Sequence, residues 1–183
     1  AIFDMTPFTQ QIIVYIGLAT AFIAATIALK QNDIKKVLAY STVSQLGYMV
    51  VALGCGAYIT AIFHVMTHAF FYFFFFLSAG SVIHGLDGEQ NIANMGGLKS
   101  KMKWTHLVFL IGTLAIVGFP PLAGFFSKDE ILAVAFSKNI PVFIGLGLCS
   151  VFTAWYMFRL YFSTFQGEYR GDHHKWDHTH ESP

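Results

Sequence analysis

This sequence contains few charged residues. Among 183 residues only 11 are Lys or Arg and 10 are Asp or Glu, so charged residues make up 11% of the chain, against roughly 25% in an average soluble domain. With 55% hydrophobic residues, too little polar surface remains to cover a water-soluble globule. The net charge of +1 also gives no basic field of the kind that binds nucleic acid. We therefore predict an all-α polytopic membrane protein.

Cysteines and cofactor motifs are nearly absent as well. Cys55 and Cys149 both lie in apolar stretches, where a thiol usually behaves as a small buried hydrophobe rather than as half of a disulfide. The sequence has no nucleotide-binding loop, no cysteine cluster for an iron–sulfur centre and no haem motif. We expect no cofactor and no redox chemistry in this chain.

Five apolar stretches are long enough to cross a bilayer. They cover residues 12–29, 37–55, 58–84, 106–136 and 142–165. The fourth is too long for one straight span, since at 1.5 Å per residue it would reach roughly 45 Å. Pro120, Pro121 and Gly124 interrupt it near its middle, so two half-helices are expected there. Residues 1–166 should form a five-helix membrane repeat, and residues 167–183 a polar, His-rich cytoplasmic loop or tail.

The basic residues alternate with these spans. One face of the membrane would receive the turn after the first span, the loop after the third, and the tail, and the other face would receive only Lys138. The basic residues of the first face are Lys30, Lys35, Lys36, Lys99, Lys101, Lys103, Arg170 and Lys175, with Arg159 close by. Because cytoplasmic loops are enriched in Lys and Arg, we expect this face to be cytoplasmic. The expected location is a bacterial inner membrane.

A lysine lies inside the fourth apolar stretch, just after the prolines. A charged group within a span is costly unless it faces protein or water, so Lys128 is a functional candidate, with Asp129 and Glu130 as supporting carboxylates. A buried lysine readily loses its proton, and a nearby carboxylate restores it. The alternative interpretation is that the three residues are the solvated end of a helix.

Two histidines four residues apart, His64 and His68, share one face of the third span. Neutral histidine donates and accepts hydrogen bonds and titrates near neutral pH, which suits a proton relay. Thr67 and Tyr72 are supporting candidates beside them. Two alternatives stay open, namely structural histidines with satisfied hydrogen bonds and a metal site. The metal site is disfavoured because no Cys, Asp or Glu in this span offers a third ligand.

The second span is unusually polar. Its hydroxyl and amide side chains either join helices or hold a chain of water molecules, and the sequence favours neither. These side chains are Tyr40, Ser41, Ser44, Gln45 and Tyr48. The histidines of the tail are expected to lie in a solvated loop with at most adventitious metal affinity. They are His173, His174, His178 and His180.

Three motifs occur in a specific order along the chain. They are DIKKVLAYSTVSQLGYM at residues 33–49, IFHVMTHAF at 62–70, and residues 118–132 around Lys128. Together they resemble the antiporter-like proton-pumping membrane subunits, and most of all the distal, L-type (fifth) subunit of respiratory NADH:quinone oxidoreductase, complex I. Related subunits occur in multisubunit sodium/proton antiporters and membrane-bound hydrogenases.

The resemblance implies a fold of two inverted five-helix repeats, of which this chain would be the second. By this resemblance Lys128 matches the lysine of the broken helix, and His64 and His68 match polar residues of the central hydrophilic axis. Asp129 stands where the family places a carboxylate. Tyr72 departs from the family pattern, because a lysine is usual there and tyrosine carries no positive charge near neutral pH.

The resemblance also implies a function, which is proton translocation as a subunit of complex I. Electron transfer would occur elsewhere, with FMN, iron–sulfur clusters and quinone in other subunits and with other membrane subunits as partners. The alternatives are a sodium/proton antiporter subunit, a membrane-bound hydrogenase subunit of the same fold, and a purely structural membrane module. The chain begins at Ala1 rather than Met and ends in a polar run, so we expect it to be part of a longer protein.

Overall fold

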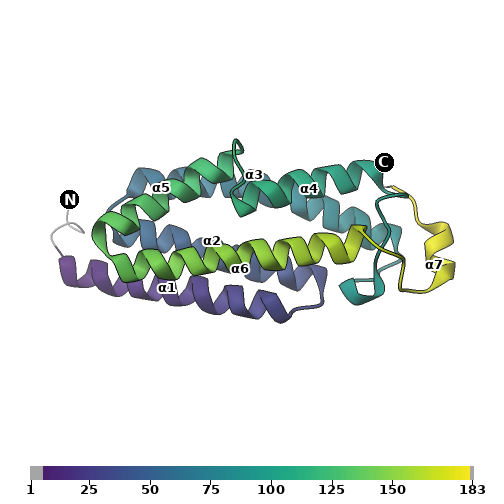
Figure 1. Cartoon of the computed structure of the whole chain (residues 1–183), viewed down its shortest axis with the longest axis horizontal. Coiled ribbons are helices and arrows are strands. Elements are labelled where there is room, and N and C mark those ends of the chain that lie inside the picture. The colour runs from purple at the N-terminus through teal and green to yellow at the C-terminus, as the bar shows by residue number, and fades with distance from the viewer. Residues whose placement is uncertain (1–5, 182–183) are drawn as a thin grey trace.

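The computed structural model describes residues 6–181 as a bundle of antiparallel helices (Figure 1). Its elements are α1 (Pro7–Lys30), α2 (Ile34–Gly54), α3 (Tyr58–Gly85), η2 (Ile92–Asn94), α4 (Lys103–Val117), α5 (Ala123–Lys138), α6 (Ile140–Phe165) and α7 (His173–His178). The first and last described residues, 6 and 181, lie at opposite ends of the bundle (Figure 1). This placement agrees with an odd number of crossings.

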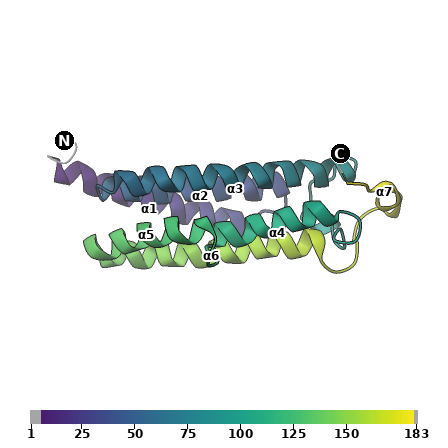
Figure 2. The same ribbon diagram turned by 90° about the horizontal axis from the view of Figure 1, so that it is seen from above.

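Four of these helices, α1, α2, α3 and α6, are long and apolar enough to cross a membrane. The fifth crossing is made by α4 and α5, which follow one another along the bundle with a break between them (Figures 1 and 2). The prediction of five spans with a discontinuous fourth is therefore confirmed. At the break Gly118 has φ 89°, a left-handed conformation that glycine adopts without strain, and its N–H bonds the Ala115 carbonyl.

Close packing of α1 against α2 rests on two glycines. A Cβ atom at Gly47 would lie 2.6 Å from the Ala21 nitrogen, and one at Gly17 would lie 2.8 Å from the Val51 nitrogen. Small residues are the usual contact residues between membrane helices, because lipid gives no hydrophobic drive for helices to associate and close van der Waals contact must replace it. This pair forms one wall of the interior in which the polar residues of α2 lie.

The phenylalanine run of α3 faces mostly outward. Phe73, Phe74 and Phe76 are exposed on the bundle surface, whereas Phe75 is fully buried and packs edge-on against Phe109 with ring centroids 5.1 Å apart. The outward rings belong to an apolar surface suited to lipid or to a neighbouring membrane helix. Phe75 and the half-buried Phe71 are the residues of the run that pack in or against the core.

The lysine-rich segments gather at one end of the bundle, as the charge alternation predicted. The α1–α2 turn and the α3–α4 loop are joined by backbone hydrogen bonds, from Ile34 N to Gln90 O (3.0 Å) and from Ile92 N to Asn32 O (2.8 Å). The α2 helix begins at this end with Asp33 as its cap, whose carboxylate accepts hydrogen bonds from the first backbone N–H groups of the helix.

The polar tail packs onto this end rather than extending into solvent. The Arg170 side chain donates to the carbonyls of Met95 (2.9 Å), Ile92 (3.2 Å) and Ser163 (2.7 Å). Trp176 stacks on Tyr169 with centroids 4.8 Å apart. His178 and His180 are exposed, as expected, and the side chains of His173 and His174 lie outside the described part of the structure.

Candidate functional site

Lys128 lies in the second turn of α5 and is only 4% exposed. Its Nζ donates a hydrogen bond to the carbonyl oxygen of Ile116 at 2.9 Å, across the break between α4 and α5. In a continuous helix that carbonyl would accept the N–H four residues on, but this residue is Pro120, which has no N–H. The proline break therefore creates a buried acceptor, and Lys128 supplies its donor at the partially negative end of α4.

The two half-helices can approach because of Gly124. A Cβ atom at this position would lie 1.9 Å from the Ala115 carbonyl oxygen, a distance that no side chain tolerates. Pro120 and Pro121 are exposed at the break, so their role is to end the helix rather than to line the interior. Gly124 and the prolines thus have different physical parts at the break: the glycine allows the close approach, and Pro120 removes a backbone donor.

The ring of Tyr48 lies close to both Lys128 and His64. Its centroid is 5.4 Å from Lys128 Nζ, a distance at which a lysine charge is attracted to the face of the ring. It is also 6.5 Å from the ring centroid of His64. The Tyr48 hydroxyl is held by α6, since it donates to the carbonyl of Leu146 at 2.7 Å and lies 2.8 Å from Ser150 Oγ.

His64 is buried, with 3% exposure, and both ring nitrogens have partners. Nε2 lies 3.1 Å from Gln45 Oε1, and Nδ1 lies 2.9 Å from Ser127 Oγ. Because an amide oxygen only accepts, Nε2 carries the proton in the neutral ring and Nδ1 accepts from the Ser127 hydroxyl. Thr67 Oγ1 donates to Ser127 Oγ at 3.1 Å. Thr67, Ser127, His64 and Gln45 therefore form one hydrogen-bonded chain across α3, α5 and α2.

His68 continues this line of polar rings along α3. Its ring centroid is 6.3 Å from that of His64 and 5.6 Å from that of Tyr72, on which it stacks at 24°. His68 is 7% exposed, and its Nε2 has no hydrogen-bond partner within residues 6–181. A buried nitrogen without a partner is costly, so its presence favours a functional or water-bonding role over a purely structural one.

Several polar side chains of α2 join it to neighbouring helices, which is one of the two roles left open above. Ser44 Oγ donates to the carbonyl of Ala21 at 3.0 Å and thus joins α2 to α1. Ser41 accepts a hydrogen bond from the Tyr156 hydroxyl at 3.1 Å, and Tyr40 is half-buried against the apolar core. Of this group only Gln45 forms a hydrogen bond with a histidine in the described part of the chain.

The two carboxylates next to Lys128 lie elsewhere. Asp129 and Glu130 are both exposed, and neither pairs with Lys128 in the described part of the chain. Glu130 Oε1 instead accepts a hydrogen bond from Thr60 Oγ1 at 2.9 Å, near the start of α3. Glu130 is therefore directed toward the face of the bundle opposite the lysine-rich end.

Sequence reasoning missed Ser127, which links His64 to Thr67 and to the lysine-bearing helix. The available signal was a hydroxyl beside Lys128 on a broken helix. Tyr48 was recognised as polar but not as a neighbour of Lys128, and Tyr156 was not recognised at all. The contacts of both depend on α6, whose charged residue Arg159 is directed instead to the end of α1, where it donates to the carbonyl of Leu29.

Residues 1–153 match a family model described as NADH:quinone oxidoreductase/Mrp antiporter, TM. The chain is similar to NAD(P)H-quinone oxidoreductase chain 5 of Picosynechococcus sp., with 54% identity over 180 residues covering 93% of this chain and 27% of the relative. It is also similar to NADH-quinone oxidoreductase subunit L of Rhodobacter capsulatus, with 51% identity over 194 residues covering 100% of this chain and 27% of the relative.

A solved structure has the same arrangement of helices. It is a chain in the structure of the membrane-bound sulfane sulfur reductase (MBS), an archaeal respiratory membrane complex. The TM-score is 0.87 at 30% identity, over 95% of this chain and 29% of that chain. This chain therefore spans 27% of the length of the two curated relatives and a similar share of the solved one.

Proposed function

We propose that this chain, which belongs to the NADH:quinone oxidoreductase/Mrp antiporter membrane family, carries protons across an energy-transducing membrane. It would do so as one repeat of a longer subunit of NADH:quinone oxidoreductase. The observation that supports this proposal best is the placement of Lys128. It is a buried ionisable group at a helix break, and its neighbour Ser127 bonds directly to a buried histidine.

The relay begins with two charge states of His64. In the neutral ring, Nδ1 accepts the hydrogen bond from Ser127. When a proton arrives, both ring nitrogens become donors, toward Gln45 Oε1 and Ser127 Oγ. The Ser127 hydroxyl can then turn its own hydrogen to the carbonyl of Gly124, which lies 3.4 Å away. The site holds both forms of His64 without moving a helix.

Lys128 and His64 would not both be charged. Like charges in one buried polar site disfavour each other, so a proton entering at His64 favours its loss from Lys128, and the reverse. His68 extends the path along α3, and its free Nε2 offers a bond to a water molecule that delivers protons. Glu130, which accepts a hydrogen bond from Thr60, would receive the proton toward the opposite end of the bundle.

The remaining parts of the activity lie outside this chain. Electron transfer, FMN, iron–sulfur clusters and quinone belong to other subunits in this proposal, and other membrane subunits are its partners. The missing repeat would complete the path with a partner carboxylate and a second lysine. The lysine-rich end of the bundle would face the cytoplasm of a bacterial inner membrane.

Lys128→Ala in the full-length protein tests the proposal. The assembled complex is reconstituted in liposomes, and proton uptake is followed with a pH-sensitive dye while NADH oxidation is recorded. We expect the protons moved per NADH to fall sharply in the variant while the complex still assembles. The matched control is Lys138→Ala, which removes an exposed lysine at the far end of the same helix and should change nothing.

Two results would contradict the proposal. Undiminished pumping by Lys128→Ala would remove the lysine from the path. If Lys128→Met raised stability without loss of transport, the polar residues would serve only to pack the helices. The same liposomes separate the antiporter alternative, since transport that depends on sodium rather than on protons alone would assign a different ion.

A further inference from the structure

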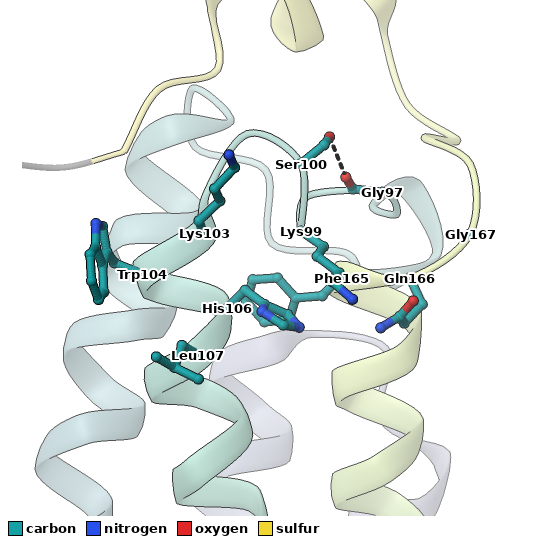
Figure 3. Close-up of a pocket in the computed structure, with 10 residues that line it drawn as sticks. All are labelled: Gly97, Lys99, Ser100, Lys103, Trp104, His106, Leu107, Phe165, Gln166 and Gly167. Carbon is teal, nitrogen blue, oxygen red and sulfur yellow. Dashed lines mark hydrogen bonds between the residues drawn. The ribbon is translucent and has the colours of Figure 1, made fainter.

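A cavity of about 840 Å³ opens between the first turn of α4 and the end of α6 (Figure 3). It lies at the lysine-rich end of the bundle, away from the helix break. The part of the α3–α4 loop that lines the cavity is anchored to α6, because Gly97 N donates to Gln166 O (3.2 Å) and Lys99 N donates to Phe165 O (3.2 Å). The backbone around the cavity is therefore held in place by the fold.

The polar part of the cavity is basic. Lys99 and Lys103 line it, and the lining contains no Asp or Glu. The Lys99 side chain points into the space between α4 and α6, toward His106 and Gln166 (Figure 3). Lys101 is different, because its Nζ lies 5.4 Å over the Trp176 ring and it is not part of the lining.

The tail carboxylate near this region is already engaged. Glu181 Oε1 accepts the backbone N–H of Thr105 at 2.6 Å and lines a neighbouring hollow that shares only Trp104 with this cavity. It therefore satisfies an N–H group at the start of α4 without neutralising the two lysines of the cavity. The cavity keeps an excess of positive charge.

The other part of the lining is apolar. Trp104 is 72% exposed, Leu107 is also exposed, and Phe165 lies behind them. Tryptophan is enriched at the level of lipid headgroups, and lysines near the ends of membrane helices extend toward the same level. The two parts of the lining thus match the two parts of a phospholipid, a phosphate and its acyl chains.

We propose that this cavity binds one anionic phospholipid, with its phosphate at Lys99 and Lys103 and an acyl chain along Trp104 and Leu107. A soluble phosphate would leave the apolar wall uncovered, and a lipid without net charge would leave the excess positive charge unbalanced. Basic pockets between membrane helices are suited to such headgroups. The site is separate from Lys128 and His64, so it does not depend on the proposed proton path.

Photolabelling of the assembled complex tests this site. The complex is incubated with phosphatidylcholine vesicles that contain phosphatidylglycerol with a photoreactive acyl chain, and the labelled peptide is identified by mass spectrometry. The peptide that carries Trp104 and Leu107 should be labelled. Lys99→Gln with Lys103→Gln should lower labelling at subsaturating lipid by roughly 30-fold, since each lysine near an anionic surface changes binding by about fivefold. The matched control, Lys101→Gln, should label as the unsubstituted protein does.

The single substitutions keep the test decisive if the double variant does not assemble, because each should lower labelling by about fivefold. The proposal is overturned if photoreactive phosphatidylcholine labels the same peptide equally, or if the lysine substitutions change nothing. It is also overturned if the unsubstituted protein is not labelled there, as when a neighbouring protein segment fills the cavity. Displacement by glycerol phosphate as effective as by phosphatidylglycerol would assign the site to a free phosphate instead.

Discussion

Ser127→Ala separates a relay from a packing role more sharply than substitution of a charged residue does. The change removes one oxygen from a fully buried side chain in a helix, where alanine is the best helix former. It leaves His64 Nδ1 without its donor, whereas Thr67 keeps the carbonyl of His64 as an acceptor at 3.1 Å. A buried polar group left without a partner costs about 1–3 kcal/mol.

If this cost of about 1–3 kcal/mol is added to the barrier for proton transfer through His64, the rate of proton transfer should fall roughly 5- to 150-fold. Proton uptake per NADH in liposomes and the thermal midpoint of the purified complex are measured together. Ser137→Ala is the matched control, because Ser137 lies on the same helix but is exposed and bonds only its own helix backbone. Normal pumping by Ser127→Ala, with His64→Ala inactive, would refute the Ser127 link and leave the path through His64 to another group.

Two further predictions concern the break and the loop. Gly124→Ala should destabilise the protein by roughly 3 kcal/mol, because the new Cβ would overlap the Ala115 carbonyl. The thermal midpoint of unfolding measures this loss. The control Gly80→Ala should change the midpoint little, because a Cβ there meets nothing within 4 Å. The Glu89 carboxylate accepts the backbone N–H groups of Asn91 and Gln90, which hold its pKa below the usual value. Its stabilisation of the loop should therefore be complete above the ordinary glutamate pKa and be lost as the pH falls through the lowered one. Hydrogen exchange of the loop amides should show this loss, and Glu89→Gln should remove the pH dependence; an unchanged pH profile in that variant would contradict it.

The sequence predicted the spans well because their signal is local. Apolar length and the prolines place five crossings and the break between α4 and α5, and several of the ends differ by a few residues. The first span was predicted from residue 12, for example, whereas α1 begins at Pro7, since Thr9, Gln10 and Gln11 do not add to an apolar run but do not end a helix. The alternation of basic residues likewise predicted which loops gather at one end.

The contacts of the polar residues were not predictable in the same way. Ser44 and Gln45 are adjacent in the sequence, yet one bonds the backbone of α1 and the other bonds His64 of α3. Successive residues of a helix point about 100° apart, so neighbours face different helices and the sequence does not say which helix lies on which side. The contacts of Ser127 with His64 and Thr67 depend on the packing of α5 against α3, which cannot be read from the sequence.

The helix break supports the proposed change of charge at Lys128. Pro120 leaves the Ile116 carbonyl without a backbone donor, and the lysine Nζ fills that place. A neutral amine still has two N–H groups, so the bond to Ile116 survives when the proton leaves, and the junction of α4 and α5 need not rearrange. An arginine here would stay charged at any pH of the cell. Lys128→Arg should therefore keep a donor at the break but lose pumping, whereas a lysine with only a structural role would tolerate the exchange.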